Sequence, residues 1–181
     1  MSLNSTPSAD RIHIGIFGRR NAGKSSIINA ITGQNLAIVS DIKGTTTDPV
    51  LKAMELLPLG PVVLIDTPGL DDEGELGKLR IKKAYQILNK TDIALLVVDS
   101  SVGMTLEDEK ILSRIQEKRI PYLIVKNKCD LLSEAIPSEE HTIFVSAANG
   151  KHISELKERI VALVPSDETE IPIVQDLLQP G

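Results

Sequence analysis

The stretch Gly18-Arg19-Arg20-Asn21-Ala22-Gly23-Lys24-Ser25 matches the phosphate-binding loop pattern G-x-x-x-x-G-K-[S/T] without a gap. Glycines at these positions let the backbone curl, so that several N–H groups can point at one anion. Lys24 adds a mobile positive charge for the β- and γ-phosphates of a nucleotide, and the Ser25 hydroxyl is an oxygen ligand suited to Mg²⁺. The stretch therefore predicts a site for the phosphates of a nucleotide.

The residues on either side supply the structure that such a loop requires. Ile12, Ile14 and Ile16 alternate before it, which predicts a strand over residues 11–17. Apolar residues at helical spacing follow it, and we expect a helix over residues 24–32 that stops at a glycine. Strand, glycine loop and helix in this order place bound phosphates at a helix N-terminus. An ordinary strand-to-helix turn is the alternative, and this context disfavours it.

Composition bounds the class of protein. The chain has 181 residues, of which 41% are hydrophobic and only 2% aromatic, so we expect one domain with an aliphatic core. A net charge of −5 argues against a general nucleic-acid surface or an anionic-membrane surface. The single cysteine, Cys129, excludes an internal disulfide, and no apolar run approaches membrane-spanning length. We therefore expect a soluble, cytoplasmic protein with no membrane contact and nucleic acid as an unlikely partner.

The ends of the chain differ in composition from its middle. Residues 1–9 are rich in Ser, Thr, Asn and Pro, and we expect a disordered tail. Residues 10–165 carry the alternating apolar segments of a single domain. Residues 166–181 are acidic and then interrupted by proline, which indicates a linker or the truncated start of a next domain.

Strands and helices alternate along the domain. A hairpin of two strands is expected over residues 50–57 and 61–65. After it, we expect helices over residues 77–89, 105–118 and 153–163 and strands over residues 93–98, 122–125 and 142–145. In the first of these helices, the expected inner residues are Leu79, Ala84, Ile87 and Leu88. Thr105 and Asp108 fit a capping box. The pattern predicts an α/β fold: a mostly parallel six-stranded sheet with one antiparallel hairpin strand and helices on both faces.

Two further segments suit the metal and the γ-phosphate of a bound nucleotide. Thr46, in a run of three threonines after Gly44, can supply a second hydroxyl to Mg²⁺, although a plain polar loop is the alternative. Asp66 ends a buried strand, where a carboxylate can hold the metal through water, and Gly69 lets a backbone N–H approach the γ-phosphate. The acidic run at residues 71–75 predicts a solvated loop over most of its length.

A third group of motifs favours guanine as the base. Guanine presents N1–H and an exocyclic amine as adjacent donors, and a carboxylate such as Asp130 accepts both. Adenine would leave that carboxylate unpaired, at a cost of roughly 2–5 kcal/mol in a desolvated pocket. Asn127 can tie this loop to the phosphate loop, and the stem of Lys128 can lie over the base. The segment Ser146-Ala147-Ala148 can offer a backbone N–H to guanine O6.

Together these motifs resemble the five motifs of translation-factor-like GTPases, over about residues 11–164. The strings Asn21-Ala22-Gly23-Lys24-Ser25-Ser26 and Ala37–Thr46 are similar to the potassium-activated branch typified by MnmE. The resemblance implies a Ras-like P-loop NTPase fold that binds GTP or GDP. It implies that Ser25 and Thr46 ligate Mg²⁺, with Asp66 behind a water.

The same resemblance implies a K⁺ site. The Asn21 side-chain oxygen would hold the ion, joined by oxygens of Ser40, Ile42 and Thr45. A monovalent cation against the phosphates can offset charge that an arginine would otherwise offset. A loop-bracing role is the alternative for Asn21.

Catalysis is the least defined part of the resemblance. Lys24, Thr46 and Gly69 would surround the γ-phosphate. Leu70 stands where small GTPases carry a water-orienting glutamine, so slow intrinsic hydrolysis is expected, with Glu73 or Glu75 as candidates to orient the water.

Longer strings resemble the GTPase domain of HydF, a maturation factor for [FeFe]-hydrogenase. They are Gly44–Val50, Met54–Pro58, Ile65–Gly74 and Asp176–Gly181. Thr47 and Pro68 depart from the usual MnmE pattern. The resemblance implies as partners the dimerisation and iron–sulfur domains of a longer chain, other hydrogenase maturation proteins, and a second copy of the G domain.

Three functions remain open from the sequence. The first is a GTP-hydrolysing switch whose segments at residues 34–48 and 66–77 rearrange with the γ-phosphate. The second is a regulatory module that binds guanine nucleotides with negligible turnover. The third is a GTPase of tRNA modification or of the ribosome, of the MnmE or Era kind.

Overall fold

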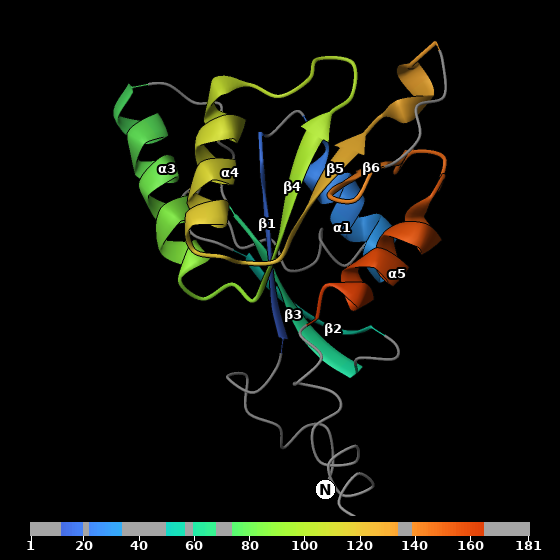
Figure 1. Cartoon of the computed structure of the whole chain (residues 1–181), viewed down its shortest axis with the longest axis horizontal. Coiled ribbons are helices and arrows are strands. Elements are labelled where there is room, and N and C mark those ends of the chain that lie inside the picture. The colour runs from blue at the N-terminus through green and yellow to red at the C-terminus, as the bar shows by residue number, and fades with distance from the viewer. Residues whose placement is uncertain are drawn as a thin grey trace, which may run out of the picture.

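A single mixed sheet organises the molecule (Figure 1). The computed structural model describes residues 12–19, 22–33, 50–56, 60–67, 74–133 and 139–164. Within these residues the six strands are β1 (Ile12–Gly18), β2 (Val50–Leu56), β3 (Gly60–Asp66), β4 (Ile93–Asp99), β5 (Tyr122–Asn127) and β6 (Thr142–Phe144). Their order across the sheet is β2-β3-β1-β4-β5-β6. β2 pairs antiparallel with β3 and the other pairs are parallel, which confirms the predicted sheet.

Helices cover both faces of this sheet (Figure 1). The described helices are α1 (Lys24–Thr32), α3 (Gly74–Leu88), α4 (Leu106–Glu117) and α5 (Ile153–Ala162). α1 and α5 pack on one face against β-strand side chains such as Ile16, Leu95 and Val125. α3 and α4 pack on the other face, against strand side chains such as Phe17 and Leu96. The alternation of side chains along each strand explains why each strand feeds both layers.

The core is aliphatic, as the composition predicts. Its described residues are Ile, Leu, Val and Ala apart from Phe17 and Phe144. None of the described helices is both long and apolar enough to cross a lipid bilayer.

Two expectations for α3 were wrong. The helix begins at Gly74 rather than at residue 77, so Glu75 belongs to its first turn and not to a loop. Leu79 is 42% exposed, whereas Ala84, Ile87 and Leu88 are buried as expected. Leu79 lies off the stripe formed by Ala84, Ile87 and Leu88, which faces the sheet.

The other boundaries agree with the prediction to within three residues. Thr105 caps α4, and the capping box with Asp108 is confirmed. β6 and α5 each end one residue earlier than expected.

The strand ends place the candidate site. Gly18, Asp66, Asp99 and Asn127 are the last residues of β1, β3, β4 and β5. Because the carboxyl ends of parallel strands meet at one edge of a sheet, these four residues share that edge.

Candidate functional site

Two glycines of the phosphate-loop stretch stand where a side chain could not. Gly18 has φ 141° and Gly23 has φ 94°, both in the region that L side chains rarely adopt. A Cβ on Gly18 would collide with the Val97 carbonyl oxygen of β4, and one on Gly23 would collide with the Asn127 side chain. The loop therefore packs closely against β4 at Gly18 and against β5 at Gly23. α1 begins directly after Gly23, with no side-chain cap on its N-terminal N–H groups.

Lys24 is drawn to the end of β3. It is only 6% exposed, and its Nζ donates to Asp66 Oδ1 at 3.2 Å and to the Thr67 carbonyl oxygen. Thr67 is itself fixed to β1, because its Oγ1 donates to the Ile16 carbonyl oxygen at 2.8 Å. The ammonium group is thus neutralised by protein oxygens that a phosphate would have to replace.

The donor set at this place suits Mg²⁺. Ser25, in the first turn of α1, is exposed, and the Asp66 carboxylate lies at the adjacent strand end. Among the described residues there is no cluster of three or more His, Cys, Asp or Glu that could hold a metal ion. Mg²⁺ bound to a nucleotide takes one or two protein oxygens and completes its shell with phosphate oxygens and water, so the Ser25 hydroxyl and the Asp66 carboxylate are donors of the kind it would use.

Asn127 joins the phosphate loop to the last loop of the sheet. It is 3% exposed; its Nδ2 donates to the Ala22 carbonyl oxygen at 3.1 Å, and its Oδ1 accepts from Ala147 N at 3.0 Å. The Asn127 carbonyl oxygen also accepts from Ser100 N at 2.8 Å. The expected tie between this loop and the phosphate loop is present, and it connects segments 105 residues apart.

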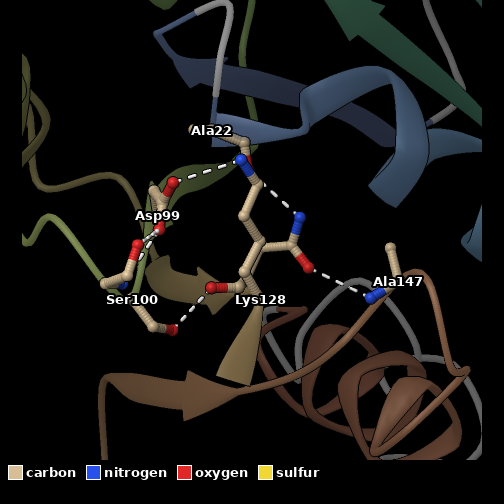
Figure 2. A network of polar contacts seen from close by, with 7 residues as sticks. Ala22, Asp99, Ser100, Lys128 and Ala147 are labelled. Carbon is tan, nitrogen blue, oxygen red and sulfur yellow. Dashed lines mark hydrogen bonds and ion pairs between the residues drawn. The ribbon is translucent and has the colours of Figure 1, made fainter. Parts of the chain in front are cut away.

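Lys128 and Asp99 form an ion pair beside this bridge. Figure 2 shows Asp99 and Ser100 on one side of Lys128, and Ala147 on the other, with Ala22 above them. Lys128 Nζ donates to Asp99 Oδ2 at 3.1 Å, while Ser101 N and Oγ donate to Asp99 Oδ1 at 2.8 and 2.6 Å. Burial alone would raise the pKa of Asp99, but the hydrogen bonds from Ser101 and Lys128 outweigh it and hold that pKa below its ordinary value.

The carboxylate expected to select guanine is also anchored. Ser146 is fully buried, and its Oγ donates to Asp130 Oδ1 at 2.8 Å while accepting from Asn149 N at 3.3 Å. Asp130 is exposed, so its carboxylate is open to a ligand. Ala147 is partly buried and Ala148 is exposed, in the turn that follows.

Several of the predicted site residues lie outside the described residues: Asn21, Ser40, Ile42, Thr45, Thr46, Gly69 and Glu73. Ser26 is exposed on α1, and Glu75 belongs to α3.

Asp99 and Ser100 belong to the site and were missed from the sequence. The available signal was their position, because Asp99 ends β4 at the same edge as the other site residues.

Comparisons with known proteins identify relatives of this chain. The family model described as "50S ribosome-binding GTPase" matches residues 13–128. The tRNA modification GTPase MnmE of Nitrosomonas europaea is 39% identical over 83% of this chain and 34% of its own length. GTPase Der of Wolinella succinogenes is 35% identical over 94% of this chain and 39% of its own length. The chain thus spans little more than a third of the length of these relatives.

Solved structures of Era share the fold. One is Era of Aquifex aeolicus bound to GDP·AlF4⁻, and another is Era with MgGDPNP and a segment of 16S ribosomal RNA. Each has a TM-score of 0.70 and 27% identity, over 84% of this chain and 56% of the other. Because the family model covers well over half of the sequence, the chain belongs to the 50S ribosome-binding GTPase family, as a P-loop G domain of the MnmE, Era and Der type.

Proposed function

We propose that this edge of the sheet binds a guanine nucleotide with Mg²⁺, and that the domain is a switch that hydrolyses GTP slowly. The observation that carries the proposal is the Asn127 bridge. It holds the Ala22 segment of the phosphate loop and the Ala147 turn beside Asp130 in one frame. Phosphate binding and base recognition therefore depend on the same buried side chain.

The residues at the phosphate end would exchange partners on binding. Lys24 would leave Asp66 and the Thr67 carbonyl for phosphate oxygens, and Asp66 would then be free to accept from a water of the metal. Ser25 and Thr46 would supply hydroxyl ligands, and Mg²⁺ would neutralise charge on the phosphates. Gly69 would offer a backbone N–H, and Glu73 or Glu75 would orient water.

At the base end, little exchange is needed. Asp130 would accept from guanine N1–H and the exocyclic amine while keeping its bond from Ser146. The Lys128 stem would cover the base, with its ammonium group held at Asp99.

The finer part of the proposal is activation by K⁺. Asn21, Ser40, Ile42 and Thr45 would contribute oxygens, as the resemblance to the MnmE branch implies. We expect phosphate release from GTP to be faster in K⁺ than in Na⁺ at equal ionic strength, and light scattering to detect a dimer only with K⁺ and a GTP analogue. Equal and negligible rates of phosphate release in both salts would contradict GTP hydrolysis by the domain. The protein would then be a module that only binds guanine nucleotides.

For the longer protein we propose hydrogenase maturation of the HydF kind. The support is the sequence strings quoted above, chiefly Ile65–Gly74 and Asp176–Gly181. The rest of the gene decides this, because HydF requires cysteines at iron–sulfur ligand spacing.

A role with RNA is the second candidate, since the relatives include a tRNA modification enzyme and an Era complex with ribosomal RNA. It predicts that RNA accelerates GTP hydrolysis by the full-length protein. A full-length chain without iron–sulfur ligands, whose turnover rises with RNA, would replace the HydF proposal with this one.

A further inference from the structure

A small cavity lies between the phosphate loop and the N-terminus of α4. Its volume is about 130 Å³, and its walls include Arg19 and Ala22 of the loop, Asp99 at the end of β4, and Asp108 of α4. Nothing in the proposed binding of nucleotide uses Arg19 or Asp108.

Asp108 presents an unpaired oxygen in this region. The residue is 2% exposed, and its Oδ2 accepts from Thr105 N at 2.9 Å and from Thr105 Oγ1 at 3.0 Å, which completes the cap of α4. Its Oδ1 is buried and has no hydrogen-bond partner among the described residues. A buried carboxylate oxygen without a donor is unfavourable, so a donor from a neighbouring residue would be gained at little cost.

Arg19 is a cation that lines the same cavity. Burial raises the pKa of the Asp108 carboxyl, whereas the hydrogen bonds from Thr105 and, after them, the positive charge of Arg19 lower it. Glu107 acts in the other direction, since its negative charge also raises the pKa of Asp108. Gly18, the preceding residue, packs closely on Val97, so the backbone here is fixed while the long Arg19 side chain can reorient.

We propose that Arg19 donates to Asp108 Oδ1 across this cavity when the loop carries a nucleotide, which makes Arg19 a positioning residue for the phosphate loop. The proposal rests on the proposed function. The loop would then be held from two sides, with Ala22 bonded to Asn127 on the β5 side and Arg19 bonded to Asp108 on the α4 side. The guanidinium would act through the loop backbone and not on the phosphates.

The test is a double-mutant cycle on the affinity for GDP, measured with a fluorescent N-methylanthraniloyl-GDP. Arg19→Gln removes the charge, and Asp108→Asn keeps the shape and one acceptor for Thr105 but replaces the other oxygen with a donor. We expect each change to weaken binding about tenfold, and the double variant to bind no more weakly than the worse single variant. Arg19→Lys should recover most of the affinity, whereas a purely structural role in the fold would not distinguish Lys from Gln.

Arg114→Gln and Glu109→Gln are the matched controls, since both side chains are exposed on α4. They should bind as the wild type does, and the melting temperature of every nucleotide-free variant shows whether it folds. If Asp108→Asn fails to fold, equal losses with Arg19→Gln and Arg19→Lys still contradict the proposal. If the wild type binds GDP but the losses in the two single variants are additive or absent, the proposed Arg19–Asp108 bond is wrong, while the proposed function stands. If the wild type binds no guanine nucleotide, both the proposed function and the proposed Arg19–Asp108 bond are wrong.

Discussion

The base end and the phosphate end of the site differ in how their polar groups are paired. At the base end, Asn127 and Ser146 are buried and bonded to several segments of the protein itself. At the phosphate end, Lys24 is bonded to Asp66 and Thr67, which are groups that a nucleotide must displace. We infer from this difference that the base end is preorganised, whereas the charged groups of the phosphate end are paired with each other and would exchange partners on binding.

The largest effect should come from the phosphate end. We expect Lys24→Ala to weaken GDP binding at least about a hundredfold, because at least two charge-assisted bonds to phosphate are lost. Calorimetric titration measures this, with the exposed Lys110→Ala on α4 as the control. A loss of less than about fivefold would show that Lys24 stays with Asp66 in the complex. The proposed difference between the two ends of the site would then be wrong.

The next effect concerns which base the preorganised end accepts. Asp130→Asn should weaken GDP binding by about fiftyfold and improve binding of xanthosine diphosphate, because xanthine has a carbonyl where guanine has the amine. Competition between the two nucleotides measures the change. The exposed Glu155→Gln on α5 should leave the ratio unaltered, and an unaltered ratio in Asp130→Asn would remove Asp130 from base recognition.

Preorganisation of the base end should also appear in stability without nucleotide. Asn127→Ala removes bonds to Ala22 and Ala147, and we expect the free energy of unfolding to fall by about 2 kcal/mol. Urea unfolding of the nucleotide-free protein is the measurement. Asn89→Ala removes an exposed amide that bonds only Lys118 among the described partners, so it should cost much less. Equal losses of unfolding free energy in Asn127→Ala and Asn89→Ala would mean that the bonds of Asn127 do not preorganise the base end.

The smallest effect should come from pH. The folded-state pKa of Asp99 lies below its ordinary value of 3.8, so its stabilising contribution is present above about that pH and is lost as the pH falls through the folded-state pKa. The stability difference between the wild type and Asp99→Asn should therefore shrink on acidification below pH 3.8. Urea midpoints across this range measure it, and Lys128→Met should reduce the same difference. If the stability difference between the wild type and Asp99→Asn does not change with pH, the Asp99 carboxylate does not contribute to the preorganisation of the base end.

Local features were predictable because neighbouring residues determine them. Strand, glycine loop and α1, the hairpin of β2 and β3, and the Thr105–Asp108 cap all depend on residues within a few positions of each other. The strand-end positions of Asp66 and Asn127 followed from the same patterns. For α3, however, the pattern placed Leu79 inside, since periodicity alone does not say which stripe of a helix is covered.

Some site features could not be read from the sequence. Lys128 meets Asp99 because β4 and β5 align Asp99 with Asn127, and Lys24 meets Asp66 because β3 lies beside β1. Asp108 was predicted as a cap, but its unpaired oxygen depends on how tightly α4 is covered.

By itself, the sequence determined the residue types of the site and the elements that carry them, because turn geometry, strand alternation and helix periodicity are short-range properties. The tertiary structure decided which charges pair, and it made Asn127 the common support of both ends of the site. The physical reason is that strand order and register bring together polar groups such as Asn127 and Ala22, 105 residues apart, whose burial then requires them to bond.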